Sequence, residues 1–198
     1  MTDNVPGWLA PALANHRPGH ARLAIARLGS EKTLGRGGFS LRSAAFRNGE
    51  ELDPSFTADE EDSVAPPLEW SAPPPGTQEL VLVVEDPDAA GDEPMCHWLV
   101  WGLAGQKGQL LEGEVPPRVG KNAQRNSEWL LPAPPHEDDP HDYVFQLFAL
   151  ELPLTLMPGA TREELLRQVE GNVLGCAVMT GTYARESEED WDDEDDLD

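Results

Sequence analysis

The apolar run Leu80–Val84 (LVLVV) limits the possible folds of this chain more than any other stretch. Short runs of aliphatic and β-branched residues bounded by turn residues are typical of buried strands. The run ends at Asp86-Pro87-Asp88, and the chain returns through a loop containing glycine and proline to His97-Trp98. A buried strand therefore brings two carboxylates and a histidine to one loop, and we expect a binding site there.

Later segments also predict strands: Trp98–Trp101 (WLVW), Tyr143–Leu150 (YVFQLFAL) and Ala177–Tyr183 (AVMTGTY). Thr161 and Glu164 have the spacing of a capping box, which predicts one clear helix. The 19 prolines and 18 glycines favour a loop-rich β architecture over a helical bundle. We therefore expect one mainly β domain over residues 39–185.

The two ends of the chain differ from this domain. Residues 1–38 predict a partly helical basic extension, and half of all basic residues lie between Arg17 and Arg47. These charges either contact an anionic lipid or partner, or belong to a docked segment whose charges are solvated or paired. Residues 186–198 contain ten acidic residues and no basic one. Such a segment repels itself, so it predicts a disordered acidic tail.

The overall composition excludes several classes of protein. The formal net charge is −23, and it is still about −13 without the tail (14 basic against 37 − 10 = 27 acidic residues), which argues against nucleic-acid binding. No apolar run approaches the roughly 20 residues of a transmembrane helix, and the N-terminus lacks a secretory signal. Two cysteines imply no disulfide framework, so we expect a cytoplasmic protein.

Five side chains can form the binding site: Asp86, Asp88, His97, His141 and Tyr143. Residues 141 and 143 are two apart in a strand and lie on the same face, whereas residue 142 lies on the other. A carboxylate that accepts one N–H of an imidazole fixes its tautomer, and two imidazoles and a phenol can then hydrogen-bond a phosphate or carboxylate. The residues alone also allow a simple turn at Asp86. His16, His20 and His136 carry no such pattern and are expected to be incidental.

Several motifs occur in a fixed order: Pro66-Pro67-Leu68-Glu69-Trp70, Asp86-Pro87-Asp88-Ala89, His97-Trp98, Pro132-Ala133-Pro134-Pro135, His141-x-Tyr143 and Thr180-Gly181-Thr182-Tyr183. Over Phe39–Arg185 the chain resembles the phosphatidylethanolamine-binding protein family, and within it the bacterial Raf kinase inhibitor-like branch. The resemblance implies an antiparallel β-sandwich with a few peripheral helices and an anion pocket at one end. It implies ligand-binding residues at Asp86, His97, His141 and Tyr143, with Asp88, Pro132 and Pro134 around them.

The chain departs from the family pattern at three positions. Ala90 replaces the second proline of DPDAP, and Leu131 replaces the glycine of GPxPP. Leucine lacks the conformational freedom of glycine, so we expect a displaced loop there. Asp142 replaces the arginine of HRY, but it points away from the pocket by strand alternation.

The predicted function is non-catalytic binding of a small anion, such as a phosphate ester or phospholipid head group, with no cofactor and no metal. Family members that inhibit kinases or proteases make a protein-interaction module the main alternative. A metal-dependent hydrolase with Asp86, Asp88, His97 and His141 as ligands is a further alternative, although the chain lacks paired metal-binding motifs. A homodimer through an exposed aromatic strand at Trp98–Trp101 is also conceivable.

Overall fold

The computed structural model describes residues 4–186, so all of the predicted acidic tail except Glu186 lies outside the described residues. Fourteen elements follow one another along this part of the chain, most of them strands. The helical segments are η1 (Ala10–Ala12), η2 (Pro18–Arg22), α1 (Ala24–Leu28), η3 (Arg36–Gly38), η4 (Pro54–Phe56) and α2 (Arg162–Val169). The strands are β1 (Leu41–Arg42), β2 (Leu68–Trp70), β3 (Glu79–Asp86), β4 (Met95–Ala104), β5 (Gly108–Leu110), β6 (Arg118–Val119), β7 (His141–Leu150) and β8 (Val173–Tyr183).

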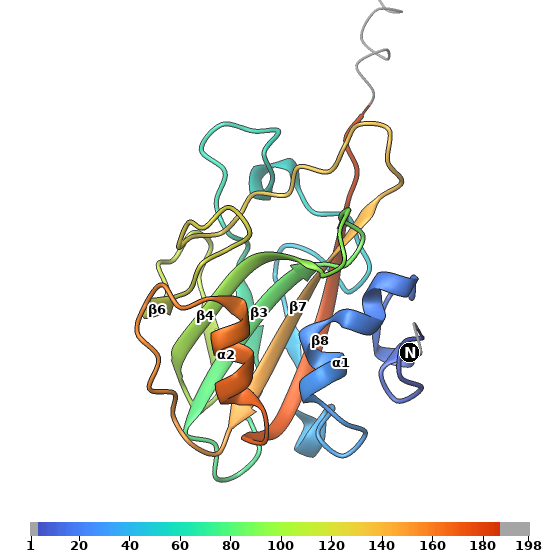
Figure 1. Cartoon of the computed structure of the whole chain (residues 1–198). Coiled ribbons are helices and arrows are strands. Elements are labelled where there is room, and N and C mark those ends of the chain that lie inside the picture. The colour runs from blue at the N-terminus through green and yellow to red at the C-terminus, as the bar shows by residue number, and fades with distance from the viewer. Residues whose placement is uncertain (1–3, 187–198) are drawn as a thin grey trace, which may run out of the picture.

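Two antiparallel sheets form the sandwich that the sequence predicted. The larger has the order β6-β4-β3-β7-β8, and the smaller has the order β1-β2-β5. Strand β3 lies in the middle of the larger sheet, between β4 and β7. The residues between 105 and 140 contain only the two short strands β5 and β6. Figure 1 shows the long strands β3, β4, β7 and β8 side by side.

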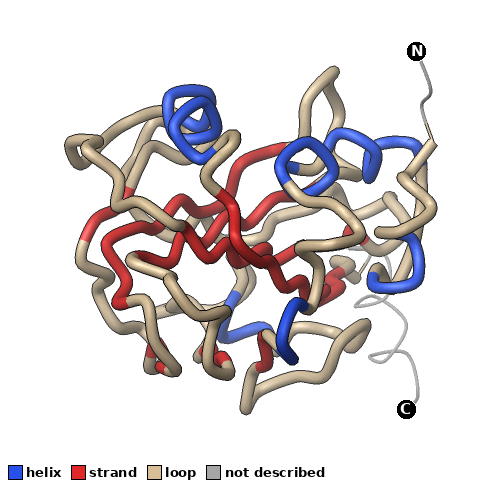
Figure 2. The backbone as a smooth tube through the Cα atoms, turned by 90° about the horizontal axis from the view of Figure 1, so that it is seen from below, coloured by secondary structure: helices blue, strands red, loops and turns tan. Residues whose placement is uncertain are grey.

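Both faces of the larger sheet are buried, which explains why its central strand is apolar without alternation. Leu82 and Val84 belong to the core between the two sheets, together with Trp98 and Phe145. The neighbouring residues Val81 and Val83 belong to a second core on the outer face. Figure 2 shows the strands between a layer that carries helices and a layer made mostly of loops.

The N-terminal segment and α2 supply that second core. Leu9, Leu23 and Ile25 have no exposed surface, and Leu165 and Leu166 of α2 lie in the same cluster. Burying each such side chain contributes about 1.5–3 kcal/mol. The region predicted as an extension is therefore packed onto the sheet, where Figure 1 shows α1 beside α2. The capping box of α2 at Thr161 and Glu164 is confirmed.

A buried polar network fixes the N-terminal segment in place. The Glu85 side chain of β3 accepts hydrogen bonds from the Ala24 backbone N–H at 2.8 Å and from Arg162 at 2.5 Å. Gln146 of β7 donates to Glu85 and accepts from the Ile25 N–H at 2.7 Å. Each of these groups is buried or half-buried, and satisfied buried polar groups hold neighbouring elements in a single arrangement.

Burial also removes the surface suggested for a homodimer. Trp98 and Trp101 are 3% and 0% exposed, so the aromatic strand is part of the core and is not free to pair with a second chain. Like β3, this strand is apolar without alternation, because each face of the sheet packs against another layer.

Candidate anion-binding site

The predicted site lies where β3 ends and β7 begins. These two strands are antiparallel neighbours, with Val84 opposite Phe145 and Glu85 opposite Val144. The register brings Asp86, the last residue of β3, beside the first residues of β7. His141 Nδ1 lies 2.7 Å from Asp86 Oδ2, and both side chains are less than one-tenth exposed. Strand ends that are 55 residues apart in sequence therefore form one histidine–carboxylate pair.

Asp86 also holds the loop that follows it. Its second oxygen, Oδ1, accepts the backbone N–H groups of Asp88 and Ala89 at 2.8 and 3.0 Å. The carboxylate is fixed from both sides and orients the imidazole. The hydrogen bond from His141 to Asp86 raises the pKa of His141 to about 9, against the opposing effect of burial. His141 is consequently a cation at neutral pH.

His97 enters the site through an irregularity in β4. Val84 pairs with Trp98 but Glu85 pairs with Cys96, so His97 is the extra residue of a β-bulge. As a result, His97 and Trp98 both contact the Trp129 ring although they are consecutive in the strand. The bulge turns His97 toward Tyr143, with their rings edge to face at a centroid distance of 5.1 Å.

The hydrogen bonds of His97 determine what it can offer a ligand. Its Nδ1 lies 2.6 Å from the Leu130 carbonyl oxygen, which can only accept, so Nδ1 carries the proton. Burial lowers the pKa of His97, which is therefore neutral near pH 7. Its Nε2 is then an acceptor, and this buried atom has no partner among the described residues. His97 and His141 thus differ in charge and in hydrogen-bonding role.

Tyr143 completes the set. Its side chain lies in the core between the sheets and is 1% exposed. Burial, together with the nearby carboxylates of Asp86 and Asp88, raises the pKa of Tyr143. The phenol keeps its proton at any physiological pH, so its hydroxyl can donate to an anion.

The other predicted site residues lie at the edges of this group. Pro132 and Pro134 are buried, and the Pro132 carbonyl accepts the Ala58 N–H at 3.0 Å. Leu131 does not have a positive φ, so this position does not need the conformational freedom of glycine. Asp88 turns away, and both of its oxygens bind Arg17 at 2.5 Å.

A second histidine–carboxylate pair lies on the opposite face of β7, and it includes a residue that sequence reasoning overlooked. Asp142 Oδ2 lies 2.8 Å from Nε2 of His20, which is fully buried. Asp142 also accepts from Asn15 at 3.0 Å and pairs with Arg17 at 3.0 Å. The carboxylate that replaces the family's arginine therefore binds the N-terminal segment. No periodic pattern links His20 to a strand 122 residues away, although its position in the basic segment was a partial signal.

The arrangement does not support the alternative reading, in which Asp86, Asp88, His97 and His141 hold a metal ion. Within residues 4–186, one group of at least three residues could converge on a metal ion, and it consists of His20, Asp88 and Asp142. It excludes Asp86, His97 and His141, and Arg17 already places a cation against both of its carboxylates. An arginine in that position neutralises the pair without a metal.

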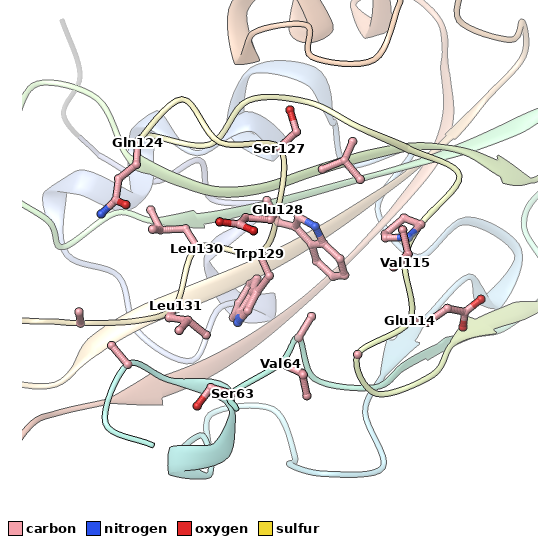
Figure 3. A pocket seen from close by; sticks show the side chains of 17 residues that line it. Ser63, Val64, Glu114, Val115, Gln124, Ser127, Glu128, Trp129, Leu130 and Leu131 are labelled. Carbon is pink, nitrogen blue, oxygen red and sulfur yellow. The ribbon is translucent and has the colours of Figure 1, made fainter. Parts of the chain in front are cut away.

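A separate groove of about 720 Å³ lies beside the candidate site. Figure 3 shows Val64, Val115, Trp129 and Leu131 around it, with Glu128 above. The groove shares the Trp129–Leu131 segment with the site, but His97, His141 and Tyr143 do not line it. Its charged lining residues are glutamates, so it is not an anion pocket.

Comparison with known proteins identifies the family. The model of the phosphatidylethanolamine-binding protein family matches residues 42–184. The chain belongs to this family. The match covers most of the sandwich, including His141 and Asp142 of β7. The N-terminal segment that supplies His20 and Arg17 precedes it.

The chain is similar to bacterial and archaeal proteins. A UPF0098 protein of Aquifex aeolicus is 34% identical over 151 residues, which cover 73% of this chain and 87% of the relative. A UPF0098 protein of Methanothermobacter thermautotrophicus is 32% identical, with 74% and 99% covered. A Mycobacterium tuberculosis relative named as a lipoprotein, LppC, is 35% identical, with 73% and 71% covered.

Solved structures agree with the fold. CT736 of Chlamydia trachomatis, described as a phosphatidylethanolamine-binding protein homologue, superposes with a TM-score of 0.70 and 31% identity, covering 75% of this chain and 98% of CT736. YbcL of E. coli gives a TM-score of 0.69 at 23% identity, covering 75% and 99%, and supports the fold alone. Among the described residues, none of the helices is long and apolar enough to cross a membrane.

Proposed function

We propose that this chain binds a small phosphate-bearing anion between His141, His97 and Tyr143, and that it catalyses no reaction on it. The observation that carries the proposal is the contrast between the two histidines. His141 is a cation held by Asp86, whereas the buried Nε2 of His97 lacks a partner. An unpaired buried polar atom costs free energy, which a ligand can recover by bonding to it. Family membership supports the choice of a phosphate ligand.

The roles of the three side chains follow from their protonation states. His141 and Tyr143 would donate to phosphate oxygens, and the charge of His141 would strengthen its bond. Neutral His97 would accept, so the ligand has to bring one proton of its own to Nε2. Hydrogenphosphate carries such a proton, and so does the ammonium group of phosphoethanolamine. Asp86 would orient His141 without touching the ligand, while Pro132 and Pro134 would form a wall of the site. Asp88 would hold the N-terminal segment.

Calorimetric titration with inorganic phosphate tests this proposal. Sulfate is the matched probe, because it has a similar size and charge but no proton at neutral pH. We expect phosphate to bind at least about tenfold more tightly than sulfate, since a site built around a hydroxyl rejects an analogue without it. Phosphoethanolamine, titrated in parallel, separates a head group from free phosphate as the preferred ligand.

Three variants complete the test. We expect H141A and H97A each to weaken phosphate binding by about tenfold or more, because each removes a polar contact in a buried site. H136A is the control, because His136 is exposed and contacts the Glu186 carbonyl outside the site. Equal phosphate affinity in all three variants and the unmodified protein would refute the proposal.

The groove beside the site favours a second candidate function, binding a segment of another protein. Val64, Leu131 and the Val115 side chain, which is 86% exposed, provide apolar surface, and Glu114 and Glu128 are the charged lining residues. Its occupant would therefore combine apolar and cationic side chains. A labelled peptide of alternating leucine and lysine should bind more tightly than its leucine–glutamate counterpart. The V64D variant should bind the lysine peptide more weakly than the unmodified protein does. Equal affinity of the lysine peptide for V64D and for the unmodified protein would exclude the groove as its binding site.

The proposed location is the cytoplasm. Cell fractionation tests it, and recovery in the membrane fraction would instead match the lipoprotein name of the mycobacterial relative.

A further inference from the structure

The outer nitrogen of His141 already has an anionic partner. His141 Nε2 lies 3.1 Å from Oδ2 of Asp138, three residues earlier in the chain. The imidazole is thus held between two carboxylates, Asp86 on one side and Asp138 on the other. The two differ in burial, because the side chain of Asp86 is 4% exposed and that of Asp138 is 49% exposed.

We propose that Asp138 is a tethered anion that occupies the ligand position on His141 and must leave before a phosphate can bind. This inference rests on the proposed function of the same site. The Asp138 carboxylate then competes with phosphate for His141, so the phosphate affinity of the chain depends on how easily phosphate displaces this carboxylate.

Charge balance is the first argument. The His141 cation is in direct contact with two carboxylates, so these three groups together carry a net charge of about −1. Asp86 cannot leave, because it is buried and also accepts two backbone N–H groups. A dianion that contacted His141 with Asp138 still in place would face like charges at hydrogen-bonding distance. The departure of Asp138 removes one of these like charges and frees the Nε2 of His141 for an anion.

Geometry is the second argument. A carboxylate oxygen and a phosphate oxygen accept the same imidazolium N–H in the same way, so the Asp138 contact reproduces one contact of the ligand. The tether is short, because Asp138 and His141 are three residues apart and the Asp138 N–H bonds the Pro135 carbonyl at 3.2 Å. A short tether gives the carboxylate an effective concentration in the millimolar range, comparable to that of a weak ligand.

The surroundings of Asp138 allow it to move. Residues 135–140 are all exposed, and the neighbouring carboxylates of Glu137 and Asp139 do not contact His141. A half-exposed ion pair contributes little free energy, because solvent screens it and ordering the side chain costs entropy. The carboxylate can therefore be displaced without disturbing the buried pair beneath it.

Alanine variants at two adjacent positions test the inference. D138A removes the tethered carboxylate, and D139A removes the same charge from the next residue of the same loop. In calorimetric titration with inorganic phosphate at pH 7.5 and fixed ionic strength, we expect D138A to bind about two- to fivefold more tightly than D139A, the range for one partly exposed charged contact. NMR titration of the His141 ring should also show a lower pKa in D138A than in D139A, because one of two carboxylates on the imidazole is gone.

The outcomes separate this inference from the function on which it rests. If the unmodified chain binds phosphate and D138A binds no more tightly than D139A, the tethered anion is overturned and the proposed function stands. If none of the three proteins binds phosphate, the proposed function fails, and the competitor role fails with it. An equal His141 pKa in D138A and D139A also overturns the inference, because it means that the contact does not form in solution.

Discussion

Two histidine–carboxylate pairs lie on opposite faces of β7, and consecutive residues of the strand contribute to them. His141 pairs with Asp86 at 2.7 Å, and Asp142 pairs with His20 at 2.8 Å. The pairs differ in their access to solvent. The second nitrogen of His141 meets an aspartate whose side chain is 49% exposed, whereas His20 is fully buried. The same chemical pair thus forms a reachable site on one face and a closed anchor on the other.

The partners of the two carboxylates explain this difference. Asp86 is held by backbone N–H groups of the loop that follows it, so its pair is assembled within the sandwich. Asp142 is held by Asn15, Arg17 and His20, all from the N-terminal segment. Changes at Asp86 should therefore affect the ligand, and changes at Asp142 should affect the attachment of that segment.

The largest expected effect is that of D142A on stability. The substitution leaves the fully buried His20 without its carboxylate partner and takes one of two carboxylates from Arg17, and losing the partner of a buried polar group costs about 1–3 kcal/mol. We expect the free energy of unfolding to fall by about that amount in urea, followed by tryptophan fluorescence. Phosphate affinity should stay within about twofold, because residue 142 faces away from the site.

D139A is the control for D142A, because Asp139 is exposed and has no part in either pair. Substitutions of this kind usually change stability by less than about 0.5 kcal/mol. A D142A protein with unchanged stability, or with lost phosphate binding, would remove the distinction between a site pair and an anchor pair.

D86N should act on the other face. A neutral amide can still accept from the loop, but it no longer stabilises the charge of His141. The pKa of His141, raised to about 9 chiefly by its hydrogen bond to Asp86, should fall by about 1–3 units. NMR titration of the histidine ring measures this directly, with D139N as the charge-matched control. An unchanged pKa would show that Asp86 does not set the charge of the site.

The pH dependence of binding follows from the same pair. A raised pKa means that His141 stays cationic up to about pH 9, and that its contribution to stability is complete below its unfolded pKa near 6.5 and is lost as the pH rises through 9. Affinity for inorganic phosphate should therefore change little between pH 7.5 and 8.5 and fall by about tenfold per unit well above pH 9. Calorimetry across this range checks it, and a midpoint near 6.5 would contradict the strength of the Asp86 pair.

The comparison also shows which features were predictable. The capping box at Thr161 and the two-residue spacing of His141 and Tyr143 depend on local geometry, and such patterns can be read directly. The family resemblance supplied the sandwich that the structure and the comparisons confirm. Simple strand periodicity does not place His97, because a bulge at this residue interrupts the regular pairing of β4 with β3.

Other features depend on contacts that no local pattern encodes. The sequence predicts a basic extension and leaves its docking open, because helical spacing does not reveal which surface a segment covers; Leu9, Leu23 and Ile25 are completely buried against the sheet. His20 appeared incidental for the same reason. Asp138 belongs to an acidic run that reads as a solvated loop, and only the fold places one of its carboxylates against His141.

The smallest expected effect is that of R17Q, which tests whether the basic N-terminal segment that holds Asp142 also binds lipid. Arg17 bridges Asp88 and Asp142, but its side chain is 43% exposed, so we expect a loss of about 1 kcal/mol in the free energy of unfolding. R42Q is the control, because Arg42 is 74% exposed and pairs with Glu69 on the smaller sheet. Binding to anionic vesicles should be equal in the two variants, because the Arg17 charge is already paired with Asp88 and Asp142. A selective loss in R17Q would instead mean that the basic segment contacts lipid, and the closed face of β7 would then have a ligand of its own.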